Sequence, residues 1–489
     1  MLSSTARFGW AAVLLNLTFF ATSVLAVALP LPLVESRPVF TAAHLPAHNH
    51  SSHTPQLSAP GAHNGPPALI HHRMTRRATN APVVSGEKLV FAHFMVGFSY
   101  SYGVGDWERD MSLAKSKGID AFALNLGSDS WQPGQISNAY NAAQNVGFKV
   151  FLSFDMTSFG CQGAGDVNVI RGYVHDYSGH AAQLQIDGKM YVTTFAGESC
   201  TFGTGDVNQG WLNAVKNNLP PTYFVPAFFI DPGATGGYSV LDGIFSWNSA
   251  WPRGNSDITF DQDQAYINGL GGRSYMAGVS PWLFVHYPGK NFIYRGDDWL
   301  WAERWELLVQ HRDSTSFAQI ISWNDYSESH YIGPVDGTQP GSQGWVDGYD
   351  HQAWLDLMQY YISAYKTGSY PAIGKDRIFL WGRLYPAGAD APDGVGRPDN
   401  WQWTEDYLWA VVLLTSPAQV TLSCGPSSQT FSVGGGLSKL KLPLAGSCSV
   451  TSQITRSGFT ALNFAPSGFD FKTNPPSYNF NTFVAASPA

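Results

Sequence analysis

Residues 318–325, Ala-Gln-Ile-Ile-Ser-Trp-Asn-Asp, decide the fold, because an apolar run suited to a buried β-strand ends there in an amide and an acid. Seven similar runs precede it along the chain. Each is short and nearly continuous in apolar residues, which is typical of parallel strands that are covered on both faces. The eight expected strands are Leu89–Gly97, Ile119–Leu126, Val150–Asp155, Met190–Gly197, Phe224–Asp231, Gly243–Asn248, Tyr275–Trp282 and Ala318–Asp325.

Helical patterns separate most of these runs, and one more follows the last. The link between the fifth and sixth runs, residues 232–242, is too short for a long helix. Repeated strand and helix units of this kind predict an α/β fold, a (β/α)8 TIM-like barrel. The expected helices are Trp107–Lys117, Asn138–Val146, Asp166–Tyr177, Asn208–Asn218, Asp261–Leu270, Trp299–Arg312 and Gln352–Lys366.

After about Lys375 the helical rhythm ends and the pattern changes. Short alternating runs separated by Gly, Pro and Ser predict a β-sandwich-like domain. We therefore expect a catalytic barrel over residues 78–374 and a β-rich accessory domain over residues 375–489. The accessory domain either binds polysaccharide or only supports the barrel, since the sequence does not show which of its aromatic side chains face outward.

The N-terminal residues have the pattern of a secreted protein. Residues 1–28 contain Arg7, an apolar run and the small-residue exit Ala26-Val27-Ala28, which together predict a signal peptide. Residues 29–77 are rich in Pro and His, which predicts a disordered propeptide that ends at the dibasic pair Arg76-Arg77. The alternative to the signal peptide is an uncleaved membrane anchor, and the alternative to the propeptide is an ordinary linker with a solvated charge cluster. We expect a monomer that is secreted to the extracellular space or cell wall, with no membrane attachment after processing.

The charge, histidine and cysteine content of the chain bears on three questions: nucleic-acid binding, metal binding and disulfide formation. The net charge of −8 provides no basic field for a polyanion, so nucleic acid is excluded as a partner. Several histidines lie between His44 and His72, but their spacing is irregular, so we predict no metal site there. Four cysteines in a secreted chain predict disulfides, and their order favours Cys161 with Cys200 and Cys424 with Cys448 among three possible pairings.

In a barrel enzyme the chemistry lies at the carboxyl ends of the strands. Polar and aromatic residues recur at that end of the expected strands. Each alone is weak evidence, because a strand-terminal Asp or Asn is often only the cap of the next helix. The substrate-binding candidates on this rim are His93, Asn125, Asp155, Glu198, Asp231, Trp247, Trp282, Trp323 and Asn324.

Asp325 and Glu328 are the catalytic candidates, because two acids three residues apart follow the last strand among aromatic residues. Two carboxyl groups with separated pKa values hydrolyse a glycosidic bond without a cofactor. A helical turn would bring their Cβ atoms to roughly 5–6 Å. The sequence does not decide between the roughly 6.5–9.5 Å of an inverting pair and the roughly 5–5.5 Å of a retaining pair.

Two other interpretations of these acids stay open. In one, Asp325 caps the next turn while Glu328 is a solvated first-turn acid. In the other, Asp155 or Asp231, which also follow apolar runs, replaces one member of the pair. Pro232 has no N–H group to satisfy Asp231, which would leave its carboxylate available. A serine hydrolase is disfavoured, because no G-x-S-x-G elbow follows a strand.

Six stretches of the chain form a shared pattern: Phe91–Gly97, Gly118–Asn125, Ser153–Met156, Phe229–Asp231, Phe245–Trp247 and Trp323–Glu328. Together these motifs resemble glycoside hydrolase family 71, the fungal α-1,3-glucanases or mutanases, over about residues 88–480. The resemblance implies inverting cleavage of α-1,3-glucan by a barrel with a companion β-rich domain. It also implies a catalytic Asp-x-x-Glu pair, which falls on Asp325 and Glu328. We assign Asp325 as the base and Glu328 as the proton donor, although nothing in the sequence distinguishes the two roles.

The sequence therefore predicts a secreted, cofactor-free hydrolase that cleaves α-1,3-linked glucan of fungal cell wall or bacterial matrix. One alternative is a barrel glycosidase with another linkage preference. The other is a non-catalytic glucan-binding wall protein. The paired acids disfavour the binding protein, which has no need of them.

Overall fold

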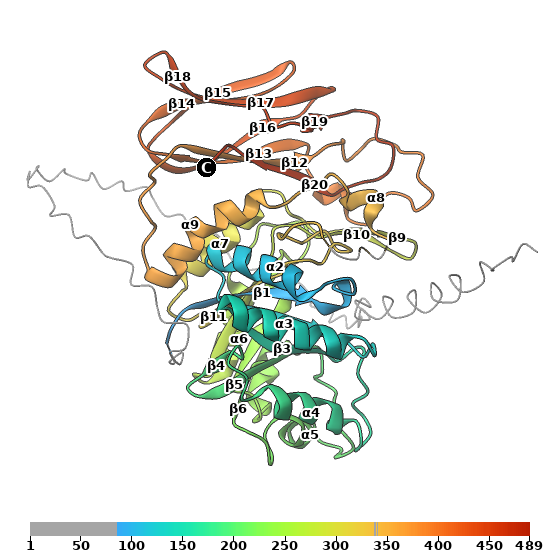
Figure 1. Cartoon of the computed structure of the whole chain (residues 1–489). Helices are drawn as coiled ribbons and strands as arrows, with labels where there is room; N and C mark the ends of the chain where they lie inside the picture. Colours follow the sequence, from blue (N-terminus) through green and yellow to red (C-terminus); the bar gives the residue numbers. More distant parts are fainter. Residues whose placement is uncertain (1–85, 337–338, 340) are drawn as a thin grey trace, which may run out of the picture. The chain divides into compact units, whose positions relative to one another are not determined.

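The computed structural model describes residues 86–336, 339 and 341–489 (Figure 1). The predicted signal peptide and propeptide lie outside the described residues. Pro82–Ala489 forms one compact unit. Within the described residues, no helix combines the length and apolarity required to cross a bilayer.

A curled sheet of nine strands forms the first part of this unit, in the order β4-β5-β3-β2-β1-β11-β8-β7 with β6 beside β5. The ladders are parallel except for the antiparallel pair β4–β5. Single backbone hydrogen bonds, Asp242 N to Phe224 O and Phe245 N to Pro226 O, link the β6 segment to β7. The predicted α/β fold with a TIM-like curled parallel sheet is confirmed. The strands are β1 Leu89–Met95, β2 Ala121–Leu126, β3 Lys149–Asp155, β4 Gln185–Ile186, β5 Lys189–Phe195, β6 Thr222–Phe224, β7 Gly243–Ser246, β8 Ser274–Val279 and β11 Phe317–Ile320.

Helices follow the strands and pack against them (Figure 1). Strand β1 shows why the strands have nearly continuous apolar sequences. Val90 and Phe94 belong to the large core that also contains helix residues such as Trp107, whereas Phe91 belongs to a second core with Phe151 of β3. Both faces of the strand are therefore buried. The helices are α2 Val104–Ser116, α3 Gln132–Val146, α4 Val167–Tyr177, α5 Val207–Val215, α6 Asp261–Leu270, α7 Leu300–Gln310, α8 Gln343–Val346 and α9 Ala353–Thr367.

The structure differs from the sequence prediction mainly at strand ends. The expected strand over Phe224–Asp231 is confined to β6, Thr222–Phe224, although Val225 N and Ala227 N still donate to β5 at 3.0 and 2.9 Å. The link after it is short, as predicted, and forms the 3-10 turn η3, Pro232–Gly237. Strand β11 already ends at Ile320, and the residues after it stay beside the end of β1, where Trp323 N donates to His93 O at 2.8 Å.

A β-hairpin that the sequence analysis did not predict lies between β8 and α7. It consists of β9, Phe284–Tyr287, and β10, Lys290–Ile293, which pair antiparallel. Gly289 in its turn has φ +79°, a conformation that favours glycine.

Two antiparallel sheets form the C-terminal part, and Figure 1 shows them as two layers. One has the order β16-β13-β12-β20, and the other β15-β14-β17-β18 with β19 on β17. Alternate residues such as Leu408 and Val420 meet between the layers in a separate core, which confirms the predicted β-rich domain. On its opposite face the first sheet packs on α9, where Trp381 lies 6.2 Å from Trp354 between ring centroids. The strands are β12 Arg377–Arg383, β13 Tyr407–Leu414, β14 Ala418–Cys424, β15 Ser427–Val433, β16 Gly436–Pro443, β17 Cys448–Arg456, β18 Phe459–Phe464, β19 Asp470–Phe471 and β20 Thr482–Ala486.

Candidate active site

Residues 321–330 follow β11 and are fastened to the end of β1, and we call them the catalytic segment because they carry the two predicted catalytic acids. Asn324 Oδ1 accepts a hydrogen bond from Met95 N at 2.8 Å, and its Nδ2 donates to Met95 O at 3.1 Å. An amide side chain thus takes the place of a strand residue beside β1. Trp323 is fully buried, and its indole N–H donates to Asp110 Oδ2 at 3.1 Å. Neither Trp323 nor Asn324 presents a free group to a sugar, and both instead position the acids that follow.

Asp325 and Glu328 lie in a tight turn rather than in a helix. Asp325 Oδ1 accepts hydrogen bonds from Ser327 Oγ at 2.7 Å and from Glu328 N at 3.1 Å. Asp325 therefore does cap a turn, as the alternative interpretation proposed. Glu328 is not a solvated acid, because its side chain is only 13% exposed, and that of Asp325 is 10% exposed.

Two groups bind the Glu328 carboxylate. Lys290 Nζ of the hairpin donates to Oε1 at 2.7 Å, and His330 Nε2 lies 3.0 Å from Oε2. His330 is fully buried, and its Nδ1 lies 2.9 Å from Ser322 Oγ. Because a carboxylate can only accept, Nε2 of His330 carries the proton that faces Glu328.

The environment drives the pKa values of the two acids apart. Burial raises the pKa of Asp325, and the neighbouring charge of Glu328 raises it further. Burial also acts to raise the pKa of Glu328, but the ammonium of Lys290 and the hydrogen bond from His330 outweigh it and hold that pKa well below its usual range. The electrostatics therefore favour a protonated Asp325 beside an ionised Glu328.

Asp325, Glu328 and His330 also have the donor types of a metal site, with one atom from each within 4.8 Å of the others. Within this structure both oxygens of Glu328 already have partners, because Lys290 Nζ donates to Oε1 at 2.7 Å and His330 Nε2 lies 3.0 Å from Oε2.

His93 and Trp247 converge on the same place. His93 is buried on β1, and burial and then the neighbouring His330 lower its pKa to about 3, so its ring is neutral. The ring of Trp247 lies 4.9 Å from that of His93 and 6.4 Å from that of His330 between centroids. The structure thus brings His93, Trp247, Asp325 and Glu328 together.

Asn125 lies one residue before the end of β2, and Asp155 ends the neighbouring strand β3. Asn125 Nδ2 donates to Ser153 Oγ at a long 3.5 Å. Asp155 Oδ1 accepts from Thr157 N at 3.0 Å and from Thr157 Oγ1 at 2.6 Å. Burial raises the pKa of Asp155, against those hydrogen bonds.

Glu198 and Asp231 follow β5 and β6 and are engaged by backbone N–H groups. Glu198 Oε2 accepts from Phe229 N at 3.3 Å. Asp231 is exposed, and its Oδ1 accepts from Gly233 N at 2.7 Å. The expectation that Pro232 leaves this carboxylate unsatisfied is wrong, because the N–H of the next residue reaches it.

Trp282 is buried, and two residues of the site were not predicted from the sequence. Trp282 is 1% exposed and its indole N–H donates to Phe480 O at 3.1 Å, so it offers no face to a sugar. His330, two residues after Glu328, and Lys290 were not among the candidates. Lys290 directly follows the dipeptide Pro288-Gly289, a turn signal between β-prone residues that predicts a hairpin.

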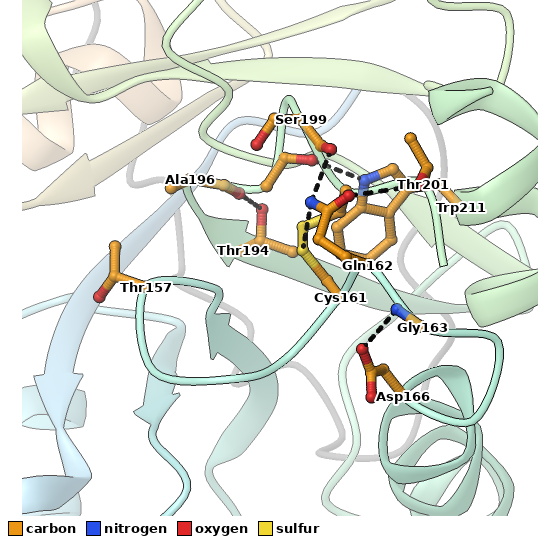
Figure 2. Close-up of a disulfide and its surroundings, with 12 residues drawn as sticks. Thr157, Cys161, Gln162, Gly163, Asp166, Thr194, Ala196, Ser199, Thr201 and Trp211 are labelled. Atoms are coloured by element: carbon orange, nitrogen blue, oxygen red, sulfur yellow. Dashed lines mark hydrogen bonds between the residues drawn. A yellow bond between two sulfur atoms is a disulfide. The ribbon is translucent and has the colours of Figure 1, made fainter. Parts of the chain in front are cut away.

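A disulfide between Cys161 and Cys200 ties together the loops that follow β3 and β5 (Figure 2). Gln162 Nε2 adds a hydrogen bond to Ser199 O at 3.1 Å across the same two loops. The second predicted pair, Cys424 with Cys448, is also formed, so both pairings are confirmed. The first bridge fixes the loops that begin beside Asp155 and Glu198.

Loss of the first bridge is expected to affect both stability and substrate binding. The double variant Cys161→Ser/Cys200→Ser opens a closed span with a sequence separation of 39 residues, and we expect it to lose roughly 2–4 kcal/mol in unfolding free energy. We expect KM to rise as well, because the two loops lose their tie. Denaturant unfolding and steady-state kinetics measure the two effects. Cys424→Ser/Cys448→Ser is the control, since it should lower stability without changing KM; equal KM values in both double variants would contradict the assignment.

Known proteins resemble the chain over nearly all of its described length. The model of glycosyl hydrolase family 71 matches residues 86–489. The glucan endo-1,3-alpha-glucosidase agn1 of Schizosaccharomyces pombe is 41% identical over 415 residues, which cover 82% of this chain and 95% of the relative. A mutanase of Penicillium rubens is 38% identical and covers 82% and 89%. Among solved structures, a GH99 endo-alpha-mannosidase matches at 13% identity with a TM-score of 0.43, over 56% of this chain and 97% of its own. The chain belongs to glycosyl hydrolase family 71.

Proposed function

We propose that the chain is a secreted glucan endo-1,3-α-glucosidase that cleaves α-1,3-glucan such as mutan or fungal cell-wall glucan. The buried Asp325–Glu328 pair, in which, of the two acids, Lys290 and His330 contact only Glu328 within hydrogen-bonding distance, is the observation that carries this proposal. Relatives named for this activity at 41% and 38% identity support the linkage. The two disulfides support passage through an oxidising compartment.

We assign Asp325 as the proton donor and Glu328 as the base, the reverse of the assignment made from the sequence. Glu328 takes a proton from a water molecule whose oxygen forms the new bond to the anomeric carbon. The bond between that carbon and the glycosidic oxygen breaks, and the departing oxygen receives the proton of Asp325. Exchange with solvent then restores the starting protonation. The raised pKa of Asp325 and the lowered pKa of Glu328 support these roles.

The spacing of the two acids sets a condition on an inverting reaction. Inverting pairs stand roughly 6.5–9.5 Å apart to admit a water molecule. Asp325 and Glu328 bring one oxygen each within 4.8 Å in the free enzyme. An inverting reaction therefore requires one of two conditions. Either glucan binding moves the carboxyl groups of Asp325 and Glu328 further apart, or Asp155 supplies the second carboxyl group.

Proton NMR of the reducing ends first released from insoluble α-1,3-glucan tests the proposal. We expect initial release of the β-anomer, because inversion at an α-linked carbon gives a β-product. For this test the chain would be expressed with its N-terminal residues and collected from the culture medium. N-terminal sequencing that finds a start near Ala78 would support the predicted processing. Initial α-anomer would instead establish a retaining reaction. No release from this glucan, with activity on another linkage in a panel, would refute the proposed specificity.

A further inference from the structure

The β9–β10 hairpin connects the acid pair to the C-terminal sheets. On one side, Phe284 N donates to Glu328 O at 3.0 Å, and Lys290 Nζ donates to Glu328 Oε1 at 2.7 Å. A backbone contact and a side-chain contact thus hold the hairpin against the catalytic segment.

Residues 393–400, in the link between β12 and β13, bind the other edge of the hairpin, and we call them the clamp segment. Asp399 N donates to Asn291 O at 3.0 Å, and Ile293 N donates to Asp399 O at 3.1 Å. Asn291 Nδ2 also donates to Gly396 O at 3.0 Å. The clamp segment therefore lies beside β10 like a third strand of the hairpin.

His286 of β9 reinforces this contact. Its Nδ1 lies 2.8 Å from Asn291 Oδ1, and its Nε2 lies 2.7 Å from Asp393 Oδ2 in the clamp segment. Asp393 Oδ2 accepts a further bond from Tyr478 N at 3.0 Å. Because neighbouring residues of a strand point to opposite faces, Asn291 faces the clamp segment while Lys290 faces Glu328.

We propose that Lys290 is a positioning residue for the acid pair, and that the clamp segment of the C-terminal domain holds it over Glu328. The active site is then incomplete without that domain. This inference rests on the proposed function, because it assigns Glu328 the role of base. The ammonium of Lys290 keeps Glu328 ionised and leaves the proton on Asp325. The other titratable groups whose charges act on the pair are His93, His330, Tyr287 and Tyr294.

Lys290→Met tests the charge while keeping most of the side-chain stem. A base must be ionised to act, and loss of an adjacent opposite charge raises the pKa of Glu328. We therefore expect the acidic limb of the kcat/KM profile to move upward by about 1–3 pH units. We expect kcat to fall more than KM rises, and Lys290→Arg to restore the wild-type limb. Lys439→Met is the matched control, because Lys439 pairs with Glu303 and Glu306 elsewhere between the same two parts of the chain.

Variants of the clamp test the second half of the proposal. Asn291→Ala and Asp393→Asn should move the acidic limb in the same direction as Lys290→Met, but less far. Wild-type profiles in both clamp variants would refute the role of the C-terminal domain. An unmoved limb in Lys290→Met, or an equal movement in Lys439→Met, would refute the role of Lys290.

A readout without substrate separates this inference from the proposed function. Carbon NMR of the full chain with labelled glutamate follows the titration of Glu328 directly. Failure to cleave α-1,3-glucan would overturn the proposed function, and the effect of Lys290 on Glu328 would still be measured. An unchanged Glu328 titration in Lys290→Met would overturn this inference even in an active enzyme.

Discussion

Asp325→Asn and Glu328→Gln are each expected to lower kcat on α-1,3-glucan by on the order of 10²–10⁴-fold, because an amide can neither donate nor accept the proton that the reaction moves. The amide oxygen that Asp325→Asn introduces can still accept the bonds from Ser327 Oγ and Glu328 N, so the turn should persist. Initial rates over a range of glucan concentrations give kcat and KM. Asp313→Asn is the control, since the side chain of Asp313 is 95% exposed.

A substrate with a leaving group that departs without a proton distinguishes the two roles. The substrate is the α-fluoride of an α-1,3-linked glucose oligosaccharide, whose fluoride departs without a proton. It should restore much of the rate of Asp325→Asn but not that of Glu328→Gln. The opposite pattern would assign Glu328 as the proton donor. Near wild-type kcat in either variant on glucan would remove that residue from the pair and direct the search to Asp155 and Asp231.

Asp263→Ala is expected to cost about 3–5 kcal/mol in unfolding free energy, because it leaves the buried guanidinium of Arg304 without its counter-charge. Asp263 and Arg304 are both fully buried and form two hydrogen bonds, at 2.6 and 2.8 Å. Arg304 of α7 also donates to Gly278 O of β8, and Tyr275 of β8 donates to Asp263 of α6. The pair therefore joins two helices to the sheet through one buried network. Denaturant unfolding measures the loss.

A double variant tests whether the Asp263–Arg304 ion pair stabilises the fold in itself, or whether Asp263→Ala is destabilising only because it leaves one buried charge unpaired. Asp263→Leu/Arg304→Met replaces both charges by apolar groups, and we expect it to be more stable than Asp263→Ala, because no buried charge remains. Asp313→Ala, at an exposed ion pair with Arg312, should change stability by less than about 1 kcal/mol. If Asp263→Ala also lowered the unfolding free energy by less than about 1 kcal/mol, the guanidinium of Arg304 would have to be compensated by another side chain or by water.

The acid pair was predictable from the sequence, but its protonation was not. The two acids are three residues apart at a strand end, so their proximity is a local property. Their pKa values depend on Lys290, which lies 38 residues from Glu328 in a hairpin that the sequence analysis missed. Trp282 fails as a sugar-binding candidate for a related reason, because its partner Phe480 is 198 residues away.

Four features were predictable from the sequence: the parallel sheet, the antiparallel sheets after it, the pairing of the cysteines and the closeness of Asp325 to Glu328. The sheets and the acid pair follow from apolar runs, turn residues and spacing, which act over a few residues, whereas the disulfide pairing follows from the order of the four cysteines along the chain. Three further features arise from long-range packing: the ends of β6 and β11, the contacts by which Trp323 and Asn324 hold the catalytic segment, and the position of Lys290 against Glu328. The physical reason is that burial and charge sum over every segment that packs around a group, and those segments come from distant parts of the chain.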